Sequence, residues 1–154
     1  MQLSHHDLYF AAQAGILRQI SALARQRPEP HGAPSADPWG VHIESCIAEM
    51  NVSLCLNQSW RPFVSKPGEL LADVGTSIQV RHTKHENGCL IVYDNENNDQ
   101  FFVLVTGISL QQKVVGWIKG SDAKQQSFWK STARFPAFFV PQHALSDISK
   151  LRDV

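Results

Sequence analysis

The spacing of apolar residues changes once along this chain, and that change constrains the fold more than any other feature. Up to Leu56, apolar residues recur every three or four positions, as they do on one face of a helix. Beyond Gly68 they gather in short runs rich in Val, Ile and Phe that turn-forming residues separate, which is typical of strands. Helices followed by strands predict an α/β fold of the α+β kind.

Two helices are predicted in the first third of the chain, at residues 8–25 and 40–56. Ser4 and Asp7 have the spacing of an N-cap pair ahead of the first helix. The expected buried stripes are Leu8, Ala12, Ile16, Leu17, Ile20, Leu23 and Ala24 in the first helix, and Ile43, Ile47, Met50 and Leu54 in the second.

A segment crowded with proline lies between these helices. Because proline lacks an amide donor and has a fixed φ angle, residues 28–39 are expected to form a loop. We therefore expect one domain over residues 1–154, with an N-terminal helix up to residue 27, the proline-rich loop at 28–39 and an α/β core at 40–154.

Five strands are predicted in the core, at residues 70–74, 77–83, 89–93, 101–106 and 113–118. The turns between them are short enough for antiparallel hairpins, so we expect a single mixed, largely antiparallel sheet whose middle is a meander. A short helix at 121–130 and a last strand at 137–140 are expected to follow.

Charge and cysteine content narrow the possible partners. The chain has 154 residues, with 14 basic and 14 acidic side chains and a pI near 7.1, so no global field attracts a polyanion. Three cysteines without paired spacing favour a reducing compartment over a disulfide framework. The first residues lack a signal-peptide pattern, and no run is long and apolar enough for a membrane span. We expect a cytoplasmic protein without a membrane partner.

The residues that suggest chemistry are Asp73, Gln79 and Arg81. Asp73 precedes a predicted hairpin turn, and the other two lie two positions apart on the next strand, where their side chains share one face. Carboxylate and amide oxygens suit a divalent ion such as Mg²⁺, and a cation nearby suits a phosphodiester. The pattern predicts a hydrolytic site, with Asp73 and Gln79 as ligands.

Residues from about Gly40 to Ile118 resemble the PD-(D/E)XK nuclease superfamily, in which a helix bearing a glutamate precedes a hairpin with an aspartate and an E-x-K or Q-x-K tripeptide. Two glutamates fit the helical position, Glu44 after Gly40 and Glu49 after Ala48. About 140° separates them around an ideal helix, so one at most faces the hairpin. Glu49 is preferred.

This resemblance implies a restriction-endonuclease-like core and a nuclease that cleaves DNA with Mg²⁺ or Mn²⁺. It implies Asp73, Gln79, Arg81 and either Glu49 or Glu44 as catalytic residues, and Asp73, Gln79 and Glu49 as metal ligands. Two positions depart from the pattern. Arg81 replaces the usual lysine and cannot act as a base, because arginine stays protonated. Gln79 replaces the commoner acid, as in Mrr-like restriction nucleases, and removes one negative charge from the metal site.

The chain is also similar to a group of small bacteriophage proteins with no established activity, which would place it in the cytoplasm of a host cell. The shared motifs read Asp73-Val74-Gly75, Gln79-Val80-Arg81, Leu90-Ile91-Val92, Gly116-Trp117-Ile118 and Phe139-Val140-Pro141.

Two alternatives to a nuclease remain open. The hairpin fits a purely structural role, in which Asp73 bonds its own backbone and Arg81 is solvated. The chain also fits a non-catalytic protein that binds a host or phage partner through its aromatic C-terminal third, and the neutral net charge favours this alternative. If DNA is the partner, the expected contacts are Lys119, Lys124, Lys130 and Arg134.

Overall fold

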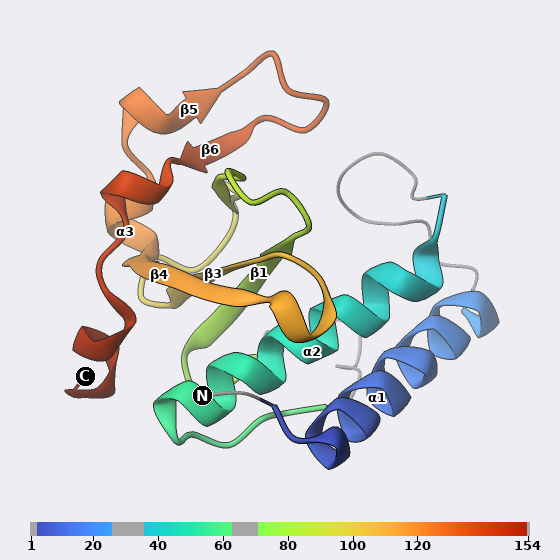
Figure 1. Ribbon diagram of the computed structural model, residues 1–154. Coiled ribbons are helices and arrows are strands. Elements are labelled where there is room, and N and C mark those ends of the chain that lie inside the picture. The colour runs from blue at the N-terminus through green and yellow to red at the C-terminus, as the bar shows by residue number, and fades with distance from the viewer. Residues whose placement is uncertain (1–2, 26–35, 63–70, 154) are drawn as a thin grey trace.

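The structure is a computed structural model that describes residues 3–25, 36–62 and 71–153. Two N-terminal helices pack together, and two small sheets follow them, one mixed and one antiparallel (Figure 1). The predicted α+β class is confirmed. Most of the predicted proline-rich loop, and the first residue of the strand predicted at 70–74, lie outside the described residues.

Both helices begin and end at residues that satisfy their terminal backbone groups. Helix α1 (His5–Ala24) opens with a capping box, in which Ser4 and Asp7 bond each other's backbone amides. Helix α2 (Pro38–Leu56) has Asp37 as its N-cap and proline at its first position, and it ends at Asn57 in the left-handed conformation. The two predicted helices are confirmed.

The inward face of α1 is not the predicted stripe. Small residues pack against α2: Ala11 and Ala14 are buried, and Gly15 lies so close that an added Cβ would be 2.5 Å from the Cα of Ile43. Leu17 is 61% exposed and lies on the outer face. The predicted stripe was wrong at its exposed members, although Leu8 packs against the core; these members are Leu17, Ile20, Leu23 and Ala24. Close helix packing selects small side chains at the contact, whatever the spacing of the large ones. The predicted stripe also did not include Ala11, Ala14 and Gly15, which are buried at this contact.

The mixed sheet contains β1 (Ile78–Thr83), β3 (Phe101–Thr106) and β4 (Lys113–Lys119), in the order β1-β3-β4. Strands β1 and β3 are parallel, and β3 and β4 are antiparallel. Before β1, isolated bridges join Trp60 to Val74 and Val74 to Ile78, which extends this sheet at the edge of β1.

The antiparallel sheet contains β2 (Leu90–Val92), β6 (Ala137–Val140) and β5 (Trp129–Lys130), in the order β2-β6-β5. The last predicted strand, β6, is confirmed. In place of the helix predicted at 121–130, the structure has α3 (Gly120–Ala123), a 3-10 turn and β5.

The prediction of one sheet with a central meander was wrong. Strand β3 is buried on both faces, with Val103 and Val105 toward α2 and Phe102 and Leu104 toward the second sheet. A one-layer meander leaves one of these faces in water, so β2 leaves its neighbours in sequence and pairs with β6 to cover it. No helix among the described residues is long and apolar enough to cross a membrane.

Candidate functional site

The centre of the candidate site is the carboxylate of Glu49, which lies between the two helices and the segment that follows α2. Glu49 is 4% exposed. The Arg18 guanidinium donates to both carboxylate oxygens, Nη1 to Oε1 at 2.6 Å and Nη2 to Oε2 at 2.7 Å. The indole Nε1 of Trp60 donates to Oε2 at 2.8 Å. Side chains from α1 and the segment after α2 therefore fix this carboxylate of α2 in one orientation.

Sequence analysis missed Arg18 and Trp60. Burial disfavours the charged form of Arg18, but the hydrogen bonds and charge of Glu49 outweigh it and raise the pKa of the guanidinium above its ordinary value. One signal was present in the sequence, because Arg18 is the one charged residue between Asp7 and Arg25. A lone charge in such a helix commonly has a buried partner.

Asp73 lies beside this pair at the edge of the mixed sheet. Its Oδ2 accepts a hydrogen bond from the backbone amide of Val80 at 2.8 Å, and its Oδ1 takes none from a described residue. Burial and, second, the charge of Glu49 raise the pKa of Asp73 from 3.8 to about 7, although the Val80 amide, Arg81 and Arg18 oppose the shift. Asp73 and Glu49 thus form an interacting pair of acids.

Gln79 and Arg81 lie near Asp73 without hydrogen-bonding to it. The Gln79 amide nitrogen donates to the carbonyl of Leu71 at 3.0 Å. Arg81 forms an ion pair with Glu96, and its guanidinium carbon lies 5.2 Å from the centre of the Phe102 ring. Arg81 is half-buried and paired, unlike the solvated arginine of the purely structural interpretation. Its positive charge still lowers the pKa of Asp73.

Glu44 belongs to a different part of the molecule. Its carboxylate accepts from the amide and hydroxyl of Ser109, at 2.6 and 2.7 Å, and from the amide of Gln112 at 2.8 Å. These bonds anchor the turn between β3 and β4 to α2. Of the two candidate glutamates, Glu49 is therefore the one that lies with Asp73.

The four basic residues proposed for nucleic-acid contact each have a partner within the chain. Lys119 lies 3.6 Å from Asp99, and Lys124 donates to the carbonyls of Asp94 and Glu96. Lys130 and Arg134 lie over the rings of Phe139 and Phe135, respectively, in the second sheet and its turn. Lys119 and Lys124 both contact the loop at residues 94–99, which also holds Glu96, the ion-pair partner of Arg81.

The donor set for a metal at this site is small. Within residues 3–25, 36–62 and 71–153, no three His, Cys, Asp or Glu side chains group together as a metal site. Glu49 and Asp73 supply two carboxylates, and the side-chain oxygen of Gln79 is the third predicted ligand. Mg²⁺ is commonly held by one or two carboxylates, with water and substrate phosphate completing its octahedron. Both Glu49 oxygens already accept hydrogen bonds from Arg18 and Trp60.

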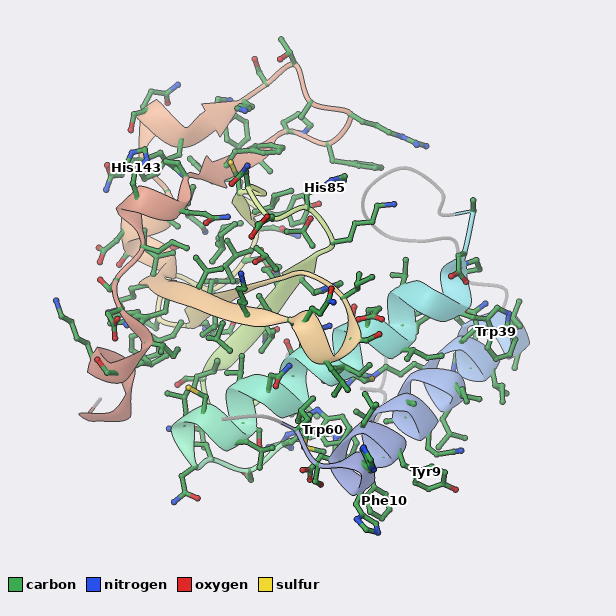
Figure 2. All side chains as sticks on the ribbon, viewed as in Figure 1. Tyr9, Phe10, Trp39, Trp60, His85 and His143 are labelled. Atoms are coloured by element: carbon green, nitrogen blue, oxygen red, sulfur yellow. The ribbon has the colours of Figure 1, made fainter. Side chains whose placement is uncertain are left out.

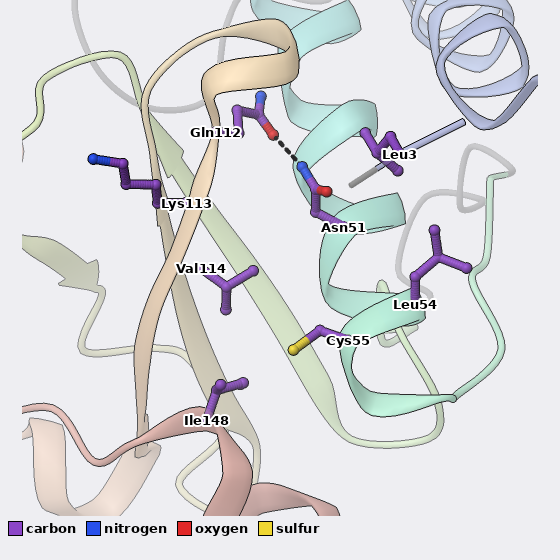
Figure 3. A pocket seen from close by; sticks show the side chains of 8 residues that line it. All are labelled: Leu3, Asn51, Leu54, Cys55, Gln112, Lys113, Val114 and Ile148. Atoms are coloured by element: carbon purple, nitrogen blue, oxygen red, sulfur yellow. Dashed lines mark hydrogen bonds between the residues drawn. The ribbon is translucent and has the colours of Figure 1, made fainter. Parts of the chain in front are cut away.

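A cavity of about 280 Å³ opens elsewhere, between α2, β4 and the C-terminal segment (Figure 3). Its wall includes Cys55, Lys113 and the hydrogen-bonded pair Asn51 and Gln112, whose amide groups are 3.1 Å apart. None of the described residues that line it carries a carboxylate. The cavity is therefore separate from the pair of acids.

Asp73 should make the stability of the fold depend on pH. Its pKa is about 7 in the folded chain and 3.8 ordinarily, so between these values the folded state binds more protons than the unfolded state. The contribution of Asp73 to stability is complete below pH 3.8 and is lost as the pH rises through about 7. We expect the free energy of unfolding to fall by about 2 kcal/mol from pH 5 to pH 8, since solvent reaching the half-buried carboxyl weakens the full effect.

Urea denaturation at several pH values measures this dependence. The matched control is Asp73→Asn, whose amide oxygen still accepts from Val80 and which does not titrate. The difference between the two proteins isolates Asp73 from the histidines. A difference that stays constant from pH 5 to pH 8 would contradict the prediction.

No family model and no curated protein or solved structure gives a significant match to this chain.

Proposed function

We propose that this protein is a metal-dependent phosphodiester hydrolase that cleaves DNA, with Glu49 and Asp73 holding Mg²⁺ or Mn²⁺. The observation that supports the proposal is the electrostatic interaction of these two acids, one from α2 and one from the edge of the sheet, in which burial and the charge of Glu49 raise the pKa of Asp73. Two carboxylates that repel each other in a partly buried place are stabilised by a divalent cation between them. The choice of DNA as substrate rests on the resemblance to PD-(D/E)XK nucleases.

The ion would supply an activated water and neutralise charge on the scissile phosphate. Asp73 offers Oδ1 to it, because its Oδ2 is bonded to the Val80 amide. Glu49 offers a carboxylate whose direction Arg18 and Trp60 fix. A fixed ligand needs little reorganisation when the ion binds, which favours a defined coordination geometry.

Arg81 supplies a permanent positive charge on the other side of Asp73. Its guanidinium is held by Glu96 and by the ring of Phe102, so it is oriented before substrate arrives. Arginine keeps its proton at neutral pH, and we therefore assign Arg81 the stabilisation of charge on the phosphate and not proton abstraction.

The test is cleavage of supercoiled, linear and single-stranded DNA by the purified protein with Mg²⁺, with Mn²⁺ and with a chelator. Asp73→Asn removes a ligand charge, and Asp122→Asn is the matched control, because Asp122 is exposed and lies outside the site. We expect ion-dependent cleavage by the wild type and the control. Asp73→Asn should lose more than about 100-fold, since even the partners of metal ligands are worth about 10–100-fold.

Calorimetric titration with Mn²⁺ in the absence of DNA provides a second measurement. One bound ion is expected in the wild type and in Asp122→Asn, and none in Asp73→Asn. Absence of both cleavage and ion binding in the wild type would overturn the proposal. Cleavage that persists in Asp73→Asn would mean that another nuclease contaminates the preparation or that the site is elsewhere.

A further inference from the structure

The outer face of α1 carries large apolar side chains that no other part of the described chain covers. Five of them are about half exposed or more, with Leu17 the most exposed at 61%. Tyr9 and Phe10 point away from the rest of the molecule in Figure 2 and touch each other, with ring centres 5.8 Å apart. The face consists of Tyr9, Phe10, Gln13, Leu17, Ile20 and Leu23. At 100° per residue these positions fall within an arc of about 140°.

This outer face of α1 carries no charge. Between Asp7 and Arg25, α1 has a single charged residue, Arg18, which turns inward to Glu49. Gln13 is the one polar side chain of the face between Tyr9 and Leu23, and His6 lies within the same arc before Tyr9. An exposed helix of a monomer usually presents charged residues to water, so an uncharged apolar face of this length indicates a surface that meets another protein surface.

The inward side of α1 supports the same interpretation. Close packing with α2 uses Ala11, Ala14 and Gly15, so the helix buries its small residues in the domain and exposes its large ones. Burying large apolar side chains contributes more free energy than burying small ones. This distribution is favourable when the large residues are buried in an assembly.

We infer that this face of α1 binds the same face of a second copy of the chain, with the two helices antiparallel about a twofold axis near Leu17. The exposed side chains offer on the order of 600 Å² of apolar surface, and aromatic side chains alone bury about 150–250 Å² each. Trp39, 42% exposed near the C-terminal end of α1, extends the patch toward the roughly 800 Å² per partner of a standard interface.

The face is complementary to itself in this orientation. Tyr9 and Phe10 lie at one end, and Leu23 lies at the other with Trp39 near it. An antiparallel pair therefore brings Tyr9 and Phe10 of each chain onto the Leu23 end of its partner. Leu17, at the middle, meets its counterpart near the axis. Interfaces between identical chains are apolar and poor in charge, and twofold dimers are the commonest assembly.

A membrane surface fits this face less well than a second copy. Helices that lie on membranes carry lysine and arginine along their polar side. Helix α1 has none in its last turn, and its one arginine is engaged with Glu49.

Sedimentation equilibrium of the full chain tests the inference. At about 50 μM, above the micromolar upper end for interfaces of this size, the wild type is expected to have twice the 17.2 kDa mass of the chain. Leu17→Lys places two charges at the axis and is expected to give a monomer with an unchanged circular dichroism spectrum. Leu110→Lys is the matched control, since Leu110 is 45% exposed elsewhere, and it should remain a dimer. A monomeric wild type would overturn the inference and assign the face to a different partner.

Cysteine crosslinking tests the orientation. Near the axis, Leu17→Cys should form an intermolecular disulfide on oxidation, whereas Tyr9→Cys should not, because antiparallel helices place the two sites about 24 Å apart at 1.5 Å per residue. The unmodified chain, with its three free cysteines, gives the background. Equal crosslinking at both positions would indicate parallel helices and contradict the proposed dimer.

Discussion

Replacing Arg18 with alanine is expected to lower the free energy of unfolding by about 3–5 kcal/mol. The change leaves the Glu49 carboxylate, 4% exposed, with the Trp60 indole as its one remaining hydrogen-bond donor among the described residues. It also removes a positive charge that lowers the pKa of Asp73, so two acids then face each other without it. Breaking one side of a buried ion pair costs more than the pair contributes, because an uncompensated charge remains.

Urea denaturation at a fixed protein concentration measures this loss. Lys113→Ala is the matched control: its ion pair with Glu86 is 3.4 Å long, and both side chains are more than 70% exposed, so less than about 1 kcal/mol is expected. The double variant Arg18→Met with Glu49→Gln should recover most of the loss, since the new amide oxygen still accepts from Trp60. A loss from Arg18→Ala as small as that from Lys113→Ala would contradict a buried pair.

Local sequence signals predicted the helices and the last strand well. Ser4 and Asp7 form their capping box within four residues, and β6 begins and ends at the predicted residues. Pairing between strands could not be predicted in the same way. The partner of β1 is β3, which lies beyond β2 in the sequence, and β2 pairs with β6 near the end of the chain. Such choices depend on which faces must be buried, and short turns alone do not determine them.

The candidate site, too, could be predicted only in part, because its residues come from segments that are far apart in the sequence. Asp73 is adjacent in sequence to the strand that carries Gln79 and Arg81, so this part of the site could be predicted from the sequence. The preference for Glu49 over Glu44 is decided by tertiary contacts, which pair Glu44 with Ser109 and bring Glu49 beside Asp73. Arg18 comes from α1, which lies outside residues 40–118, and no motif connected it to the site.

Gly15→Val is expected to destabilise the fold by about 3 kcal/mol, the upper part of the usual range for overpacking. A Cβ at this position would lie 2.5 Å from the Cα and 2.7 Å from the amide nitrogen of Ile43, and both are backbone atoms that cannot rotate away. Helix propensity alone predicts the opposite sign, because glycine is the less favourable residue within a helix by several tenths of a kcal/mol. The sign of the change therefore distinguishes close packing from propensity.

Thermal and urea unfolding at one protein concentration measure the Gly15 effect, with the concentration held fixed because dimer formation changes the apparent stability. The matched control is Gln126→Val, which introduces the same side chain at an exposed position outside α1 and its outer face and should change stability by less than about 0.5 kcal/mol. To accommodate a valine at position 15, α1 must move away from α2, which loosens the packing around Ala11 and Ala14 and pulls Arg18 from Glu49. Gly15→Val should consequently weaken Mn²⁺ binding as well as lower stability. If the contact between the helices has no influence on the pair of acids, the variant will lower stability alone.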